Sequence, residues 1–309
     1  MTRVAVVDLG TNSTRLLVAD VEDGNVEALD RRLEITRLGE GVDSRRQLLP
    51  DAVARVRNVL VDYRRAAEEQ GAERTLAFAT SAVRDAENGQ AFLGELEWSY
   101  GFTTELLTGH AEALLTFRGV STGREIEDRT LVVDVGGGST ELILGGPDGV
   151  SFHESYDLGC VRLTERFPGD PESAAEFVRH TLASLELAPR EAIGVAGTVT
   201  QLATLDLGLE REEPNLVHGH WLKTDAVAAL LGQLAGLPVE EIRRLRGMHP
   251  ERAPVIVAGT VVVLETLRRF GLEELEVSER DIMHGAALAA AALPAPVEGD
   301  APPGAYTCC

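Results

Sequence analysis

One short phrase occurs twice in this chain of 309 residues. The first copy is VVDLGTNSTRL, residues 6–16, and the second is VVDVGGGSTEL, residues 132–142. Each copy has an apolar run, an acidic residue, a turn of small residues and a second apolar run, which predicts a β-hairpin with a carboxylate at the strand end. Because glycine lets other groups approach the backbone and turn amides form an anion-binding concavity, each turn is a candidate phosphate loop. Two facing copies would hold a phosphate chain from both sides.

The two phrases open two halves with the same order of elements. In the first half we expect strands at 3–9, 13–20, 25–34, 75–79 and 103–107. We expect helices from Pro50 onward, at 90–99 and at 110–119. In the second half we expect strands at 130–134, 139–144, 150–156, 192–196 and 274–277. We expect helices at 160–167, 171–186, 198–206, 224–235, 251–270 and 282–292. Three consecutive strands followed by alternating helices and strands predict an α/β protein, a duplicated βββαβαβα unit whose mixed sheets carry helices on both faces.

We expect the boundary between the halves where the periodic spacing of apolar residues is lost. Residues 121–125 are polar and unpatterned, so we predict one domain over 1–121 and a second, with extra helices, over 122–293. The last helix, 282–293, is expected to pack back on the first domain. Residues 294–309 are rich in Pro, Gly and Ala and are expected to form a disordered tail.

Bulk properties exclude several classes of function. The net charge of −21 argues against a nucleic-acid partner, and no apolar run is long enough to span a membrane. Asp8 interrupts the only apolar stretch that could serve as a signal peptide, so we expect a cytoplasmic protein. Cys160, Cys308 and Cys309 do not suggest a disulfide framework. A polyanionic substrate would need local arginines, backbone amides or a divalent cation to offset the negative field.

Seven segments resemble the exopolyphosphatase and guanosine pentaphosphate phosphatase family, within the superfamily of actin, sugar kinases and chaperone ATPases. They are DLGTNS (8–13), ATSAVRDA (79–86), TGHAEA (108–113), DVGGGSTE (134–141), LGCVRL (158–163), GT (197–198) and RA (252–253) followed by VIVAG (255–259). They lie in one order over nearly the whole chain, which makes the resemblance specific. It implies two ribonuclease-H-like domains around a central cleft, a phosphoanhydride hydrolase that uses Mg²⁺, and a homodimer.

The chain also departs from this family's pattern. Longer members carry a helical C-terminal extension that this chain is expected to lack. Pro254 stands where an acidic residue is usual after Arg-Ala, and Met283 and His284 replace the usual Arg-Glu before Gly285. These departures leave the preferred substrate open.

Two acidic residues of the second phrase are candidate metal ligands. Hairpin closure can bring Asp134 and Glu141 within reach of one cation, and Mg²⁺ binds through few carboxylates while keeping several waters. Alternatively, Glu141 is only an exposed strand residue. Glu141 aligns with Arg15 of the first phrase, a charge reversal where a metal ligand would be useful. The resemblance assigns Asp134 and Glu141 to metal binding and catalysis.

Glu112 is the candidate general base. It is expected in the first turn of a helix, where a glutamate can also simply complement the helix dipole. The resemblance implies that Glu112 accepts a proton from the attacking water, with no phosphoenzyme intermediate.

The candidate phosphate ligands come from the two turns and from two strand ends. They are Asp8, Gly10, Thr11, Asn12, Ser13, Arg84, Gly136, Gly137, Gly138, Ser139, Gly197 and Thr198. Alternatively, Arg84 forms a salt bridge to Asp85 or Glu87, and Thr198 caps a helix. Arg162 and Arg252 are weaker candidates, and we expect His218 and His220 at a loop or strand position near the cleft rather than in a metal site.

The sequence thus predicts a Mg²⁺-dependent exopolyphosphatase that releases terminal orthophosphate from inorganic polyphosphate. A guanosine pentaphosphate 5′-phosphohydrolase would use the same site. Two other classes stay open: an ATP-dependent sugar or acetate kinase, which would need an acceptor hydroxyl, and an actin-like scaffold, which would not require Glu112. Sequence alone gives neither the preferred chain length nor the oligomeric state.

Overall fold

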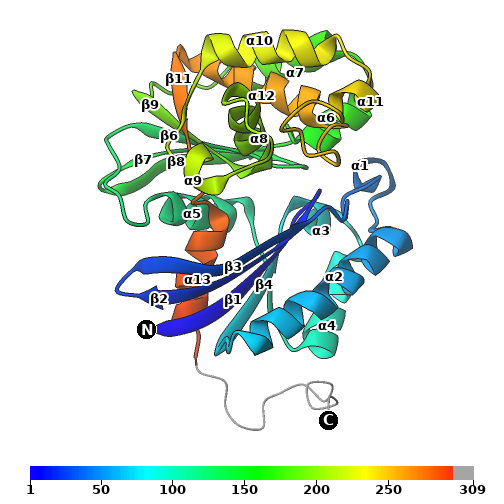
Figure 1. The fold of residues 1–309 in the computed structure, drawn as a ribbon, viewed down its shortest axis with the longest axis vertical. Coiled ribbons are helices and arrows are strands. Elements are labelled where there is room, and N and C mark those ends of the chain that lie inside the picture. Colours follow the sequence, from blue (N-terminus) through cyan, green and yellow to red (C-terminus); the bar gives the residue numbers. More distant parts are fainter. Residues whose placement is uncertain (295–309) are drawn as a thin grey trace. The chain divides into compact units, whose positions relative to one another are not determined.

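The structure is a computed structural model that describes residues 1–294, and it divides into two compact units (Figure 1). Among the described residues, unit 1 consists of 1–124 together with 282–294, and unit 2 is Glu125–Asp281. The tail expected from residue 294 lies, beyond Pro294, outside the described residues, as do the last two cysteines. None of the described helices has the length and apolarity needed to span a membrane.

Unit 1 is a five-stranded mixed sheet with helices on both faces. Its strands are β1 (Thr2–Leu9), β2 (Thr14–Glu22), β3 (Asn25–Glu34), β4 (Arg74–Ala79) and β5 (Thr103–Leu106), in the order β3-β2-β1-β4-β5. The first three strands are antiparallel, and β4 and β5 continue the sheet in parallel with β1. Its helices are α1 (Val42–Arg45), α2 (Pro50–Glu69), α3 (Ser81–Asp85), α4 (Gly89–Tyr100), α5 (Gly109–Val120) and α13 (Ile282–Ala292).

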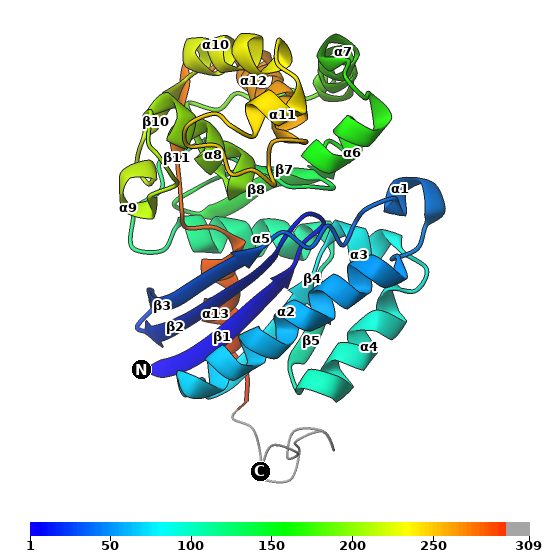
Figure 2. The ribbon, with the colours of Figure 1, turned by 45° about the vertical axis from the view of Figure 1, so that its right-hand side comes forward.

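Alternate residues of β1 belong to two separate hydrophobic cores, because successive side chains of a strand point to opposite faces of the sheet. Ala5 and Val7 pack with the buried residues of α2 and α4. Val4 and Val6 pack with the small and apolar residues of α13. Figure 2 shows α2 and α4 in front of this sheet and α13 behind it. The C-terminal helix is therefore part of unit 1.

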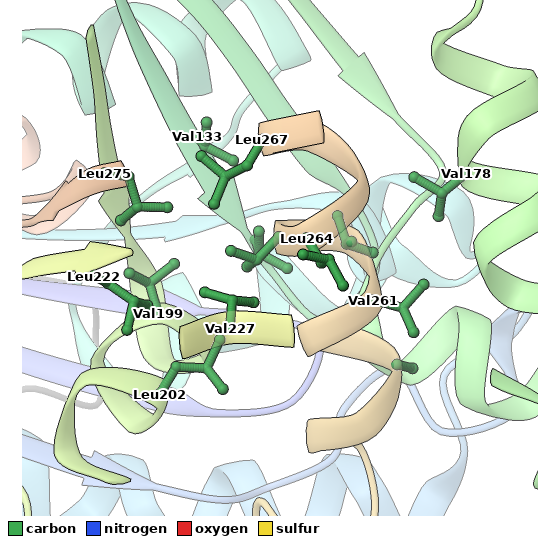
Figure 3. Close-up of a cluster of buried hydrophobic side chains, with 14 of the residues drawn as sticks. Val133, Val178, Val199, Leu202, Leu222, Val227, Val261, Leu264, Leu267 and Leu275 are labelled. Carbon is green, nitrogen blue, oxygen red and sulfur yellow. The ribbon is translucent and has the colours of Figure 1, made fainter. Parts of the chain in front are cut away.

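Unit 2 repeats this plan with one further strand. Its strands are β6 (Thr130–Val135), β7 (Thr140–Gly146), β8 (Gly149–Tyr156), β9 (Glu191–Val195), β10 (Trp221–Lys223) and β11 (Glu274–Val277), in the order β10-β11-β9-β6-β7-β8. Its helices are α6 (Cys160–Arg166), α7 (Pro171–Leu182), α8 (Ala196–Asp206), α9 (Pro214–Val217), α10 (Thr224–Ala235), α11 (Val239–Ile242) and α12 (Ile256–Phe270). Its core is centred on α12, whose Val261, Leu264 and Leu267 are completely or almost completely buried (Figure 3).

The predicted fold class is confirmed. The run β8-β7-β6-β9-β11 has the same order and strand directions as β3-β2-β1-β4-β5, with β10 added at the edge. The helix expected over 251–270 begins only at Ile256; residues 251–255 form turns, and Pro254 disfavours helical backbone at the residue before it. The short elements α1, α3, α9, α11 and β10 were not predicted. The central cleft expected between the domains stays a prediction.

Candidate active site

The two repeated phrases form hairpins of identical register. In unit 1, Asp8 on β1 lies directly opposite Arg15 on β2. In unit 2, Asp134 on β6 lies directly opposite Glu141 on β7. The charge reversal noticed in the sequence is therefore a difference between two equivalent cross-strand pairs. One hairpin places a carboxylate opposite a guanidinium, and the other places two carboxylates opposite each other.

Both turns are closed by the same hydrogen bond. The amide of Gly10 donates to the carbonyl of Ser13, and the amide of Gly136 donates to the carbonyl of Ser139, each at 3.0 Å. These two amides serve the turns themselves. We therefore narrow the predicted phosphate-binding amides to those of the two residues that follow each of these glycines.

The hairpin of unit 1 carries its own counter-ion. Nε and Nη2 of Arg15 donate to Oδ2 of Asp8 at 2.9 and 2.7 Å, and Asp8 is only 5% exposed. The turn is also fixed to the start of α3, because the hydroxyls of Thr11 and Ser81 are hydrogen-bonded at 2.9 Å. The pair is neutral overall, so this hairpin can approach a phosphate without two carboxylates repelling it.

The hairpin of unit 2 has no such internal cation at the equivalent position. Glu141 is buried, and its Oε1 accepts a hydrogen bond from Ser155 Oγ at 2.7 Å. Like charges directly opposite on neighbouring strands are destabilising unless a cation offsets them. The donor set of Asp134 and Glu141 consists of hard oxygens and fits Mg²⁺. Within residues 1–294 no group of three or more His, Cys, Asp or Glu side chains could hold a metal, so water and substrate would supply the remaining ligands.

The glycine turn of unit 2 also receives the first amides of α6. The amide of Cys160 donates to the carbonyl of Gly136 at 3.0 Å, and that of Val161 donates to Gly137 at 2.9 Å. These helix N-terminal donors would otherwise lack partners. A Cβ on Gly159 would overlap the backbone of Gly137. Only glycine permits this approach, which fixes the outline of the turn.

Unit 1 has a counterpart of this contact that we did not predict. The amide of Gly39 donates to the carbonyl of Thr11 at 2.8 Å, and a Cβ on Gly39 would overlap the Thr11 side chain. Leu38-Gly39 follows β3, as Leu158-Gly159 follows β8, and both leucines are buried. The dipeptide Leu-Gly therefore occurs after the third strand of both halves. This repeat was the signal in the sequence that could have predicted the glycine that packs against each turn.

Glu112 lies in the first turn of α5. Thr108 caps this helix by accepting a hydrogen bond from the amide of Ala111 at 3.2 Å. Glu112 is 5% exposed, and Nη1 of Arg84 donates to its Oε2 at 2.6 Å and to the carbonyl of Leu107 at 2.8 Å. The observed ion pair of Arg84 thus joins α3 to the candidate base, and not to the acids considered from the sequence.

The remaining arginine candidates hold loops in place. Nε of Arg162 donates to the carbonyl of Gly138 at 2.9 Å. Nη1 of Arg252 donates to the carbonyl of Gly197 at 3.0 Å and to Glu212 at 2.6 Å. Both guanidinium groups therefore support the backbone of predicted phosphate loops.

The third loop lies where β9 enters α8. Ala196 adopts a φ of 69°, a left-handed conformation that is strained for alanine. Thr198 lies inside α8 and does not cap it, because the N-cap is Val195. Elsewhere in unit 2, Nε2 of His220 is 2.7 Å from Asp206, and His218 accepts a hydrogen bond from a backbone amide, so neither histidine is in a metal group within the described chain.

Known proteins resemble this chain over nearly its whole length. Residues 17–292 match the Ppx/GppA phosphatase family. Exopolyphosphatase 2 of Mycobacterium tuberculosis is 38% identical over 322 aligned residues, covering 94% of this chain and 99% of the relative. Among solved structures, the Ppx/GppA family member of Aquifex aeolicus is 31% identical with a TM-score of 0.79, covering 93% of this chain and 97% of the other. An exopolyphosphatase from Cytophaga hutchinsonii, 24% identical, shares the fold with a TM-score of 0.85 over 94% of this chain and 98% of its own.

Proposed function

Because the chain belongs to the Ppx/GppA phosphatase family, we propose that it is a Mg²⁺-dependent exopolyphosphatase that releases terminal orthophosphate from inorganic polyphosphate. The observation that carries this proposal is the opposed pair Asp134 and Glu141, at the register position where the duplicate hairpin has an ion pair. A guanosine pentaphosphate 5′-phosphohydrolase is the alternative, because the same residues would serve it.

Asp134 and Glu141 would hold the magnesium ion. When bound, Mg²⁺ offsets negative charge on the phosphoryl oxygens of the substrate. The hydrogen bond from Ser155 to Glu141 fixes one carboxylate oxygen, which limits the rotation of this side chain. The two acids therefore supply a partly preorganised pair of oxygen ligands.

Each unit contributes groups that can bind phosphate. In unit 1 these are the amides of residues 11–12 and the hydroxyl of Ser13, beside a neutral ion pair. In unit 2 they are the amides of residues 137–138 and the hydroxyl of Ser139. The partial positive charge of backbone amides attracts anions, and it would help to offset the field of a protein with a net charge of −21.

Glu112 acts as general base in this proposal. Water attacks the terminal phosphorus in line, the new P–O bond forms as the anhydride P–O bond breaks, and the water proton passes to the Glu112 carboxylate. Arg84 holds one oxygen of this carboxylate and orients the other. The remaining polyphosphate chain leaves as an anion.

We also propose a cytoplasmic homodimer whose partner molecule is polyphosphate and which needs neither nucleic acid nor a membrane. Light scattering of the purified protein would test the dimer. Family membership favours hydrolysis over the kinase and scaffold classes.

Phosphate release from tripolyphosphate, long-chain polyphosphate and guanosine pentaphosphate tests the function, with and without Mg²⁺. Glu112→Gln should lower turnover roughly a hundredfold or more, the usual effect of removing a general base. The matched control is Glu105→Gln, because Glu105 is exposed on β5 and should tolerate the change. Unchanged turnover by Glu112→Gln would remove Glu112 from the mechanism. Faster turnover of guanosine pentaphosphate than of either polyphosphate would favour the alternative.

A further inference from the structure

The helix that carries Glu112 packs against the C-terminal helix. Ala111 and Leu115 of α5 contact the apolar core that includes Ile282 and Ala286 of α13. Figure 1 shows α13 passing close to α5 within unit 1. Ala111 and Leu115 thus face the core that α13 helps to form, and Glu112 lies between them in the same turn of α5.

A glycine of α13 lies directly against the backbone of α5. A Cβ added to Gly285 would lie 2.7 Å from the carbonyl carbon of Leu115 and 3.0 Å from its Cα, and it would overlap the carbonyl oxygen. Backbone therefore lies against backbone here, with no side chain between. Leu115 follows Glu112 by three residues, less than one helical turn. Any displacement of Leu115 is consequently transmitted to Glu112.

The start of α13 is fixed independently. His284, next to Gly285, is 3% exposed, and Nη2 of Arg31 on β3 donates to its Nε2 at 3.1 Å. This contact uses one of the residues that replace the family's usual Arg-Glu. Because α13 cannot slide away at this end, an added methyl group at position 285 should push α5 rather than α13.

We propose that Gly285 is a positioning residue for Glu112, since its bare backbone sets where α5 presents the carboxylate. The inference rests on the proposed role of Glu112 as general base. A larger residue at position 285 displaces α5 by a distance on the order of 1 Å, and a misplacement of that size lowers turnover by up to about a hundredfold.

The first test compares two helical glycines of unit 1. Gly285→Ala should lower kcat on tripolyphosphate about tenfold to a hundredfold with little change in KM. Gly94→Ala is the matched control, because a Cβ at Gly94 in α4 meets nothing within 4 Å, and its kcat should stay at the wild-type level. Circular dichroism and thermal melting show whether each variant is folded at the assay temperature.

A second pair approaches the same contact from α5 and serves if Gly285→Ala does not fold. Leu115→Ala removes a side chain that packs on α13 and should also lower kcat. Leu114→Ala removes the neighbouring leucine, which is 43% exposed, and should leave kcat unchanged.

A double-mutant cycle separates positioning from general loss of structure. In a Glu112→Gln background, Gly285→Ala or Leu115→Ala should have no further effect on kcat, because the group they misplace is already absent. An additive loss in that background would overturn the inference, as would wild-type kcat in a folded Gly285→Ala. If Glu112→Gln itself leaves turnover unchanged, the proposed role of Glu112 as general base fails, whatever the position 285 variants do.

Discussion

Replacing Glu141 by arginine should turn the hairpin of unit 2 into a copy of the hairpin of unit 1. The new guanidinium would lie opposite Asp134, as Arg15 lies opposite Asp8. The variant should then bind no magnesium through this pair. The result can be measured as thermal stability without any substrate, so it does not depend on catalysis.

The expected magnitudes follow from binding linkage. Mg²⁺ at a hundred times its dissociation constant should stabilise the wild-type protein against unfolding by about 2.7 kcal/mol. Unit 2 spans residues 125–281, which is 157 residues. For a domain of that size each kcal/mol shifts Tm by about 2–4 °C, so saturating Mg²⁺ should raise its Tm by about 5–11 °C. In Glu141→Arg this shift should disappear. Its metal-free Tm should rise, because a cross-strand pair of opposite charge contributes up to about 1 kcal/mol.

The assay is differential scanning fluorimetry over a Mg²⁺ titration at constant ionic strength. Glu141→Gln keeps the side-chain size and should also lose the magnesium shift, which covers the case in which arginine does not fit this buried position. Glu154→Arg is the matched control, because it makes the same charge change at an exposed position of β8 in the same sheet. The reasoning is refuted if Glu141→Arg and Glu141→Gln keep the wild-type shift, or if Glu154→Arg loses it equally.

Two further predictions concern an ion pair of unit 1 and a buried thiol of unit 2. Arg15→Ala should lower the free energy of unfolding by about 3 kcal/mol, because it leaves the buried carboxylate of Asp8 without its guanidinium. Arg3→Ala should lower it clearly less, since the pair of Arg3 with Asp20 on the same two strands is more exposed; urea unfolding checks this, and equal losses would contradict it. Burial raises the pKa of the Cys160 thiol to about 11, so at pH 8 this thiol is protonated and should react with a thiol reagent only on unfolding. Mass spectrometry of a variant in which serines replace Cys308 and Cys309 measures this labelling. Rapid labelling of the native protein would contradict the prediction.

Much of the fold could be predicted because its signals are local. Buried, valine-rich runs such as residues 4–7 and 131–133 mark central strands, and the repeated phrase fixes their pairing with the strand that follows. The repeated order of elements then implies the two sheets. The short element α1 was missed because a single turn between Gly41 and Arg46 has too few residues to show a period.

The candidate site was predicted less completely, because its contacts join distant segments. The ion pair of Arg84 with Glu112 spans 28 residues and depends on β4 and β5 being neighbours in the sheet. The Leu-Gly residues that support each turn follow loops of different length, so they do not align with the repeated phrase. The magnesium ion, the homodimer and the roles assigned to individual residues stay predictions.

The helix α13 covers one face of the sheet of unit 1 although it is synthesised after the whole of unit 2. Until α13 has been synthesised, Val4, Val6 and Leu17 lack the apolar cover that this helix gives them in the folded unit. Such surfaces attract chaperones and aggregate when chaperones are scarce. Termination before residue 282 should therefore leave the sheet of unit 1 incomplete even though all five of its strands had already been made.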